Sequence, residues 1–382
     1  MTESTGTEQR HAGWVELFYD LLFVVFVAQL AHPLTNHPTW TAALTLLVLF
    51  LPAWWVWVGS TLYTNLTGDI TAARRVDVLV QMAILLVLAA SAPQAVNGHP
   101  ALFACAYAAS RVDVVVFRLL VRGKWPVGGA NWPLLVSAAL WVGSIFLHPP
   151  LAYLPWLVGL VVEIVPWVRP RPSGSEVQQR LVSGQIETTH LIERFGSFMI
   201  IVLGEAIAQI VASIAGAGAG PSAVITGVAA FVLVAMLWWL YFDFGSSVAE
   251  RALGARPAEA FRLTRSIFMI GHFFLVVALV ALAAGLGGLV TAGAHGQGGG
   301  HALILCVIAL GVYLVNNATV GLVGIRYSVK QVLRWLLPNL LALVVFGLFG
   351  ENLPPLVPLL VIAVFLSIET VPKLEGAFAR ER

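Results

Sequence analysis

Two acidic residues stand one helical turn apart at the start of an apolar segment, WVELFYDLLFVVFVAQLAH, which runs from Trp14 to His32. Glu16 and Asp20 are four residues apart, so on a helix their carboxylates share a face and can act on one partner. Carboxylates inside a membrane span are costly to bury, and they usually face the interior of a helix bundle. Val27 and Ala31 continue the same face, which predicts close packing against a second helix.

A related pattern begins at His190 in the segment HLIERFGSFMIIVLGEAIAQIVA. His190, Glu193, Arg194 and Glu205 fall within about a third of the circumference of one helix. Glu205 is about twelve residues into the span, which at 1.5 Å per residue places it roughly 18 Å deep, near the bilayer midplane. An unpaired carboxylate there would cost several kcal/mol if ionised. We expect Glu205 either to exchange a proton or cation during transport or to hold helices together through a fixed hydrogen bond or ion pair.

The ends of these two helices are expected to bring a second polar group together near the cytoplasmic surface. This cytoplasmic-end cluster consists of Glu16, His190, Glu193 and Arg194. Its simplest interpretation is a structural latch between helices. Candidate basic partners for the two glutamates stand at neighbouring helix starts, at Arg74, Arg75 and Arg262.

Arg111 lies near the middle of the fourth apolar segment and needs an anionic partner there. Asp113 is only two residues away and cannot share its face, so the candidate partners are the acids of the first and seventh apolar segments, including Asp20 and Glu205. The corresponding part of the tenth segment carries two amides, which can hydrogen-bond across helices without a charge. We expect either a central polar site for protons or solute, or an ion pair with an amide clamp that fixes helix packing, built from Asp20, Arg111, Asp113, Glu205, Asn316 and Asn317.

Aromatic and imidazole side chains have more ordinary interpretations. The tryptophans at 54, 55, 57, 238 and 239 could line an aromatic pocket, but tryptophans commonly anchor helices at the membrane interface, which is the interpretation we favour. His272 lies in an apolar segment and is expected to be a core histidine with its hydrogen bonds satisfied. No catalytic motif, metal site or cofactor site is predicted.

The composition of the chain indicates an integral membrane protein. Hydrophobic residues make up 59% of the 382 residues and charged residues only 10%, against about 25% in soluble proteins. The mean hydropathy is +0.88. The formal net charge of +2 gives no indication of nucleic-acid binding, and two cysteines within apolar runs provide no disulfide framework. The polar residues before Trp14 do not resemble a cleavable signal peptide, so we expect the first span to be retained.

A membrane-spanning helix needs roughly 20 apolar residues, and on that rule the sequence predicts about twelve spans. Connections that carry Lys or Arg alternate with connections that carry neither, which predicts that both termini lie in the cytoplasm and that the protein crosses the cytoplasmic membrane many times. The expected spans are Trp14–His32, Trp40–Tyr63, Val76–Ala92, Ala101–Val121, Trp132–His148, Leu151–Val168, His190–Ala215, Ala223–Phe244, Ile267–Val290, Ala302–Ile325, Val332–Phe349 and Pro355–Val371.

Matching residues recur in the same order along the two halves of the chain. Trp54-Trp55 matches Trp238-Trp239, and ALFAC from Ala101 matches ALILC from Ala302. Six spans per half is an even number, so the two repeats are expected to be parallel rather than inverted. This predicts a cytoplasmic tail over 1–13, a first six-helix repeat over 14–168, a cytoplasmic linker over 169–189, a second repeat over 190–372 and a cytoplasmic tail over 373–382.

The segment VELFYDLLFV, which begins at Val15, resembles the bacterial low temperature requirement protein A family, whose first helix carries an E-L-F-Y/F-D-L-V/L-F-V stretch. ERFGSFMIIVLGEAI from Glu193 is similar to the second recognisable segment of that family. The resemblance extends from Trp14 to about Pro372. The family is named for a growth phenotype, so the resemblance implies a multi-span architecture and no particular reaction.

Buried ionisable groups and tandem repeats favour a secondary transporter or ion pathway that moves a small solute or ion, with protons as a candidate coupling ion. One alternative is a membrane-embedded enzyme acting on a lipid or isoprenoid, which would need a lipid-facing opening beside the acids. Another is a non-catalytic scaffold involved in growth in the cold. The expected partners are the lipid bilayer and a small solute or ion.

Overall fold

The computed structural model describes residues 13–36, 39–67, 71–122, 131–168, 188–246 and 263–378. Within these ranges nearly every residue is helical and no strand occurs. The all-α fold predicted from the sequence is therefore confirmed.

The described helices of the first half follow one another along the chain. They are α1 (Trp14–Asn36), α2 (Trp40–Thr67), α3 (Ala72–Val96), α4 (Ala101–Arg122), α5 (Trp132–Gly143), which a short 3₁₀ turn η1 (Ser144–Phe146) extends, and α6 (Tyr153–Val168). The local sequence determines where α3 begins. The Thr71 side chain caps α3 by accepting a hydrogen bond from the backbone N–H of Arg74 at 3.3 Å.

Helices of the second half include three π-helical segments at helix ends. They are α8 (Thr188–Gly216), α9 (Pro221–Trp239) with η2 (Leu240–Ser246), η4 (Thr264–Gly271) with α12 (His272–Ala294), α13 (Gly300–Thr319) with η5 (Val320–Ile325), α14 (Val329–Phe349) and α15 (Leu356–Phe378). Ser328 and Gln331 form a reciprocal capping box at the start of α14.

Eight of the described helical stretches are long and apolar enough to cross a membrane. These are α1, α2, α3, α8, α9 with η2, η4 with α12, α13 with η5, and α14. Helices α5, α6 and α15 offer shorter apolar stretches, and α4 carries Arg111, Asp113 and Arg118 within its 22 residues. A multi-pass helical membrane protein is therefore supported, and the count of twelve spans stays a prediction.

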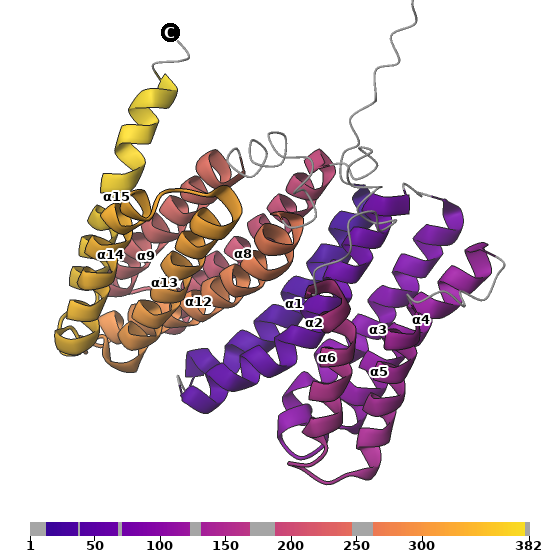
Figure 1. The fold of residues 1–382 in the computed structure, drawn as a ribbon. Coiled ribbons are helices and arrows are strands. Elements are labelled where there is room, and N and C mark those ends of the chain that lie inside the picture. The colour runs from indigo at the N-terminus through magenta and orange to yellow at the C-terminus, as the bar shows by residue number, and fades with distance from the viewer. Residues whose placement is uncertain are drawn as a thin grey trace, which may run out of the picture.

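The two halves of the chain pack against each other mainly through four helices. Figure 1 shows α1 to α6 gathered on one side and α8 to α15 on the other. Helices α1 and α2 of the first half each contact α8 and α12 of the second half. Val27 and Ala31 on the inner face of α1 are fully buried, which confirms the close packing predicted for that face.

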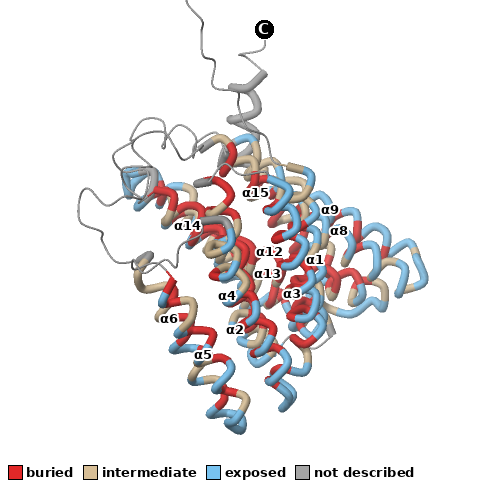
Figure 2. The backbone as a smooth tube through the Cα atoms, turned by 90° about the vertical axis from the view of Figure 1, so that its right-hand side faces the viewer, coloured by how far each residue is buried: buried red, intermediate tan, exposed pale blue. Residues whose placement is uncertain are grey.

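Helix α12 lies at the centre of the second half and is the most deeply buried of the candidate spans. Its glycines let neighbouring helices approach closely: a Cβ at Gly285 would lie 2.6 Å from Cys306 Sγ on α13, and one at Gly287 would lie 2.8 Å from Ser213 Oγ on α8. Figure 2 shows buried residues along α12 and α13 and exposed residues along the outer helix faces.

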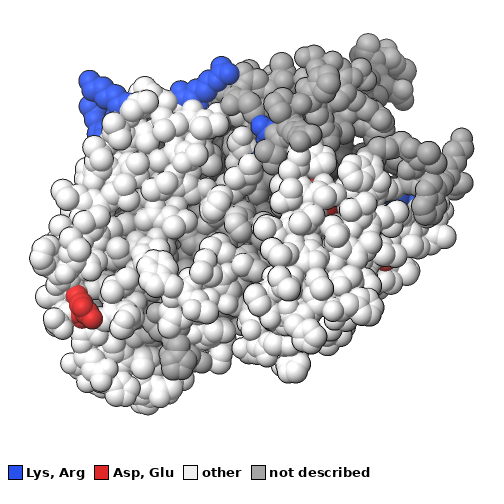
Figure 3. Space-filling view, turned by 60° about the horizontal axis from the view of Figure 1, so that its bottom comes forward, with Lys and Arg blue, Asp and Glu red and all other residues white. Residues whose placement is uncertain are grey.

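The outer surface has the charge distribution of a membrane protein. In Figure 3 the visible Lys and Arg side chains lie along one edge, and the broad surface below them is almost uncharged. Exposed Arg75, Lys330 and Arg334 lie where α3 and α14 begin, and we call this the basic side. Exposed Glu351 lies in the loop after α14, on the opposite side.

Candidate functional site

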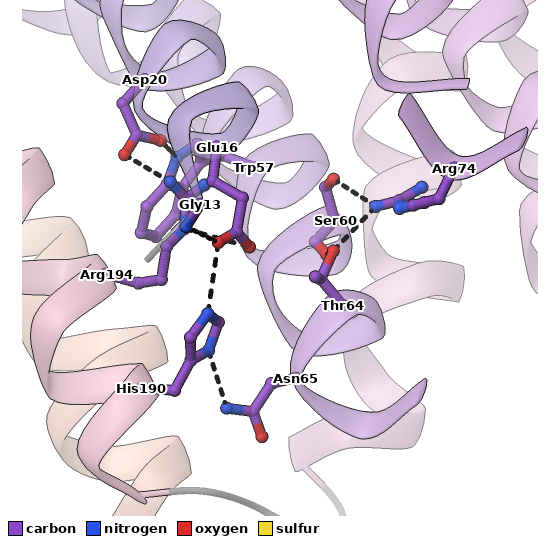
Figure 4. Close-up of polar contacts among 10 residues, drawn as sticks. All are labelled: Gly13, Glu16, Asp20, Trp57, Ser60, Thr64, Asn65, Arg74, His190 and Arg194. Atoms are coloured by element: carbon purple, nitrogen blue, oxygen red, sulfur yellow. Dashed lines mark hydrogen bonds and ion pairs between the residues drawn. The ribbon is translucent and has the colours of Figure 1, made fainter. Parts of the chain in front are cut away.

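Helices α1 and α8 are joined by a buried group of charged side chains. Arg194 Nη1 donates to Asp20 Oδ2 at 2.6 Å, and His190 Nε2 lies 3.2 Å from Glu16 Oε2 (Figure 4). Arg194 Nε is also 3.8 Å from Glu16 Oε1. The Asp20–Arg194 and Glu16–His190 pairs each join residues that are 174 positions apart in the chain. Helices α1 and α8 therefore run parallel and in register here. We call Glu16, Asp20, His190 and Arg194 the α1–α8 cluster.

Helix α2 supplies further hydrogen bonds to this cluster. Trp57 Nε1 donates to Asp20 Oδ1 at 2.7 Å, so each oxygen of that carboxylate has a donor. Asn65 Nδ2 lies 3.1 Å from His190 Nδ1 (Figure 4). An amide nitrogen only donates, so Nδ1 accepts and the ring proton on Nε2 faces Glu16. The carboxylate of Asp20 is thus stabilised from both halves of the chain.

Aromatic rings enclose the α1–α8 cluster and keep it from lipid. The Trp57 ring lies 4.8 Å from Phe195 and 4.6 Å from Phe198, and the Trp54 ring stacks on Trp57 at 5.2 Å. Trp54 Nε1 donates to the carbonyl of Met269 in η4 at 2.9 Å. Trp54 and Trp57 are fully buried, so the prediction that they anchor α2 at the membrane interface is wrong.

One of the basic residues predicted as partners of Glu16 and Glu193, Arg74, pairs with another acid. Arg74 pairs with Asp77 one turn along α3 and donates to Ser60 Oγ and Thr64 Oγ1 of α2, both at 3.0 Å. Glu16 instead meets the histidine and arginine of α8. The prediction of Arg74 is wrong because Arg74 faces α2 and finds an acid on its own helix. Arg75 is exposed at the start of α3, and Arg262 lies outside the described residues.

Arg111 forms its ion pair within the first half of the chain. Arg111 Nη1 lies 3.1 Å from Glu163 Oε2 of α6, and Tyr107 donates to Glu163 Oε1 at 3.1 Å. Arg111 Nε donates to Ser110 Oγ at 3.2 Å. Arg111 is 3% and Glu163 2% exposed. The sequence predicted an acid of the first or seventh apolar segment, Asp20 or Glu205, as the partner, and that prediction is wrong because α6 packs beside α4 and places Glu163 next to Arg111.

The Arg111–Glu163 pair lies deep in the helix bundle. Arg111 is about three turns before the end of α4 on the basic side, which at 1.5 Å per residue is roughly 16 Å. Glu163 follows the first residue of α6, Tyr153, by about three turns. Arg111 therefore lies at the middle of α4, and Glu163 lies about two-thirds of the way along α6, five residues before its last residue, Val168. An acid this far into an apolar helix was the signal in the sequence that could have identified Glu163.

Further polar side chains lead from the basic side toward this pair. Gln81 Nε2 donates to Asp77 Oδ2 at 2.9 Å, one turn deeper along α3 than the Arg74–Asp77 pair. Asp113 on α4 is half-buried beside Gln81, and the charges of Arg74 and Arg111 both act on its carboxylate. We call the following six residues the polar ladder: Arg74, Asp77, Gln81, Asp113, Arg111 and Glu163.

Tyr19 lies close to both the polar ladder and the α1–α8 cluster. It precedes Asp20 on α1 and is only 1% exposed. The positive charges of Arg111, Arg74 and Arg194 all act on its hydroxyl, which makes no hydrogen bond to either group among the described residues.

Aromatic side chains close the other side of the Arg111–Glu163 pair. Trp141 of α5 and Trp156 of α6 stack at 4.5 Å, and Tyr107 and Phe103 of α4 pack against them at 4.0 and 5.4 Å. Phe103 and Tyr107 precede Arg111 along α4, as Trp156 precedes Glu163 along α6. We call these four residues the aromatic stack. It fills the space between the ion pair and the side opposite the basic one.

Comparison with known proteins places this architecture in a family. The family described as bacterial low temperature requirement A protein (LtrA) matches residues 11–370. The chain belongs to this family. The match extends over both halves and includes the α1–α8 cluster, the polar ladder and the aromatic stack.

Among curated proteins, the chain is similar to the uncharacterized protein RA0937 of Rhizobium meliloti (strain 1021). The two are 28% identical over 297 residues, which cover 73% of this chain and 70% of that protein. No solved structure matches the chain.

The remaining residues of the central site predicted from the LtrA sequence do not join one group. Glu205 is half-buried and accepts a hydrogen bond from Gln209 Nε2 of its own helix at 2.8 Å. Asn317 donates to the carbonyl of Tyr313, also on its own helix, at 3.0 Å. Asn316 faces a groove between α12 and α13.

Three residues of the second predicted polar cluster, Glu16, His190 and Arg194, lie in contact, and Glu193 is half-buried next to them in the sequence. The cytoplasmic position of this cluster stays a prediction. His272 is a core histidine with both ring nitrogens bonded, at 2.8 Å to the Ile267 carbonyl and at 2.8 Å to the Tyr241 hydroxyl, as predicted.

Among the residues that the structure describes, no three His, Cys, Asp or Glu side chains lie close enough to share a metal ion.

Proposed function

We propose that this LtrA protein is a secondary transporter or ion pathway that carries protons, alone or with a small solute, across the cytoplasmic membrane. The observation that carries the proposal is the Arg111–Glu163 pair, a charged pair buried about halfway through the bundle. Replacing a buried ion pair by apolar side chains of similar volume is often neutral or stabilising, so such a pair is weak evidence for stability alone. Ionisable groups at this depth commonly line ion and proton paths.

The polar ladder supports an entrance from the basic side. Arg74 and Asp77 lie within the first turns of α3, Gln81 is one turn deeper, and Asp113 leads on to Arg111. Carboxylates and amides at successive depths can relay a proton or guide a small polar solute through apolar surroundings. We propose that Glu163 is the proton-binding group at the end of this path.

The aromatic stack supports a closed state toward the opposite side. Four packed rings cover the Arg111–Glu163 pair on this side, and the polar atoms among them are held in place, since Tyr107 donates to Glu163 and Trp156 Nε1 donates to Ser144 Oγ at 2.9 Å. Transporters alternate access by moving helix groups against each other. We propose that α5 and α6 move relative to α4 to open this side, while the α1–α8 cluster keeps the two halves of the chain together.

The architecture that we propose for this mechanism is twelve spans in two parallel six-helix repeats over 14–168 and 190–372, with both termini in the cytoplasm. The neighbours of the helices support it. Helix α1 contacts α2 and α3, as α8 contacts α9 and α12, and the successive contacts α3–α4–α5–α6 correspond to α12–α13–α14–α15. The exposed basic residues at the starts of α3 and α14 favour that side as the cytoplasmic one.

An enzyme that acts on a lipid would need an opening to the bilayer next to the acids. The groove between α12 and α13 does face outward, but its lining contains no Asp, Glu or His. Transport therefore fits the described geometry better than lipid chemistry.

Proton flux into liposomes tests the proposal. The purified chain is reconstituted with a pH-sensitive dye inside, and flux is driven by a potassium diffusion potential. We expect Glu163→Gln to lower the flux at least tenfold. Glu205→Gln is the matched control, because it neutralises an acid of another span outside the polar ladder, and we expect it to change the flux less than twofold. Wild-type liposomes no more permeable than empty ones, or equal flux in Glu163→Gln and wild type, would overturn the proposal.

A further inference from the structure

An outward-facing groove runs between the paired helices η4–α12 and α13–η5. It encloses about 690 Å³, within the range of 300–1,000 Å³ typical of small-molecule sites. Its walls are mostly aliphatic, and several wall residues are half open to the outside: Ile270 is 42%, Phe274 43% and Val315 48% exposed. In a bilayer these side chains meet hydrocarbon, so the groove opens to lipid.

The polarity of the groove changes along its length. Ser266, Thr319 and Asn316 line the half nearer the basic side, whereas Phe274 and Ile308 line the deeper half. Gly271 lets the two helices approach closely here, since a Cβ there would lie 3.0 Å from Val320 Cγ2. An occupant of this groove must have a polar end near the basic side and an apolar remainder.

The length of the groove fits one leaflet of a bilayer. From Ile308 to Val323 along α13 and η5 is about 22 Å at 1.5 Å per residue. Half of a hydrocarbon core is about 15 Å, so the groove covers the full depth of the chains in one leaflet and part of the interface.

Basic residues follow or precede the polar end of the groove in the sequence. Arg265 precedes Ser266 in η4, Arg326 follows η5 directly, and exposed Lys330 lies in the first turn of α14. Clusters of Lys and Arg at the membrane surface attract anionic lipid headgroups. Tyr327, 42% exposed beside them, is typical of the interface region.

We propose that this groove binds one acyl chain of an anionic phospholipid from the leaflet on the basic side. The chain lies against Phe274, Gly311 and Val315, the ester groups face Asn316, and the phosphate faces these basic residues. No residue of the groove belongs to the polar ladder or the α1–α8 cluster, so the lipid site is independent of the proposed transport function.

Gly311 allows a direct test. It lines the groove, and a Cβ built on it meets no atom within 4 Å, so a larger side chain there occupies the lipid site without displacing a neighbour. Gly204 on α8 is the matched control: it is an exposed helical glycine with equally open space, outside the groove.

The full chain is placed in nanodiscs with phosphatidylglycerol that carries a photoreactive diazirine on one acyl chain, and the cross-linked peptides are quantified by mass spectrometry. We expect labelling of residues 266–274 and 308–323 to exceed that of the other lipid-facing helices at least fivefold. Gly311→Leu should lower this labelling at least fivefold, Gly311→Val should lower it less, and Gly204→Leu should leave it unchanged.

A second probe tests the assignment of the headgroup. The corresponding photoreactive phosphatidylcholine should label the groove at least threefold more weakly, and Lys330→Gln should reduce the difference between the two probes. Uniform labelling of all lipid-facing helices, or equal labelling in Gly311→Leu and Gly204→Leu, would overturn the lipid site. Equal labelling by the two lipids would overturn the selection of an anionic headgroup.

Discussion

Removing one partner of the Asp20–Arg194 pair should destabilise the protein more than removing both. Asp20 is 0% and Arg194 2% exposed, so Arg194→Gln leaves a carboxylate away from water with only the Trp57 hydrogen bond at 2.7 Å. Loss of one partner of a buried ion pair costs about 3–5 kcal/mol. In Asp20→Asn, Arg194 keeps Glu16 at 3.8 Å, and we expect a smaller loss of about 1–3 kcal/mol.

The double variant Asp20→Asn with Arg194→Gln replaces both charges by amides that can still hydrogen-bond. Its free energy of unfolding should lie within about 2 kcal/mol of the wild type, which gives a coupling energy of about 2 kcal/mol or more between the two sites. Unfolding of the full chain in mixed micelles with increasing dodecyl sulfate, followed by circular dichroism, measures all four proteins.

A second double-mutant cycle, on Glu205 and Gln209, is the control. These side chains lie one turn apart on a single helix and are half-buried, so their coupling should stay near 0.2–0.5 kcal/mol. Additive effects of the Asp20 and Arg194 substitutions, within about 0.5 kcal/mol, would refute the inference that a desolvated ion pair joins α1 to α8.

Three further outcomes follow from the packing and the topology. Trp57→Phe should lower the free energy of unfolding by about 1.5–3 kcal/mol, because it removes a hydrogen bond to the buried carboxylate of Asp20, and the same micelle titration measures it. Gly285→Val should reduce the yield of monodisperse protein in size-exclusion chromatography, because its Cβ would lie 2.6 Å from Cys306 Sγ and 3.1 Å from the α13 backbone; an unchanged yield would contradict the close approach of α12 and α13. A cysteine at Glu351, in a variant without the native cysteines, should react with an impermeant maleimide added outside intact cells, and protection there would reverse the proposed orientation.

Local patterns in the sequence were enough to predict an all-helical membrane protein and the buried face of α1. The four-residue spacing of Glu16 and Asp20 and the small residues that follow predicted which face of α1 is buried, because helix periodicity alone determines that face. His272 was also predicted correctly, since an isolated histidine in an apolar helix must find partners nearby. Family membership followed from the motif at Val15 and is confirmed over residues 11–370.

The pairing of charges could not be predicted, because it depends on which helices are neighbours. Arg111 had several possible acids in the sequence, and only the packing of α4 against α6 selects Glu163. Likewise Asp20 and Arg194 were assigned to different groups, and the parallel register of α1 and α8 joins them. Trp57 resembles an interface anchor by type and becomes a core residue through its bond to Asp20.

The proposed transport function requires that the Arg111–Glu163 pair serves transport rather than folding. The double variant Arg111→Gln with Glu163→Gln separates the two roles, because it removes both charges and leaves two amides that can hydrogen-bond in the same place. Its proton flux, measured in liposomes beside its unfolding free energy, is the most direct test. We predict a protein within about 2 kcal/mol of the wild type in stability that carries protons at least tenfold more slowly. A double variant that is stable and conducts like the wild type would contradict the central claim.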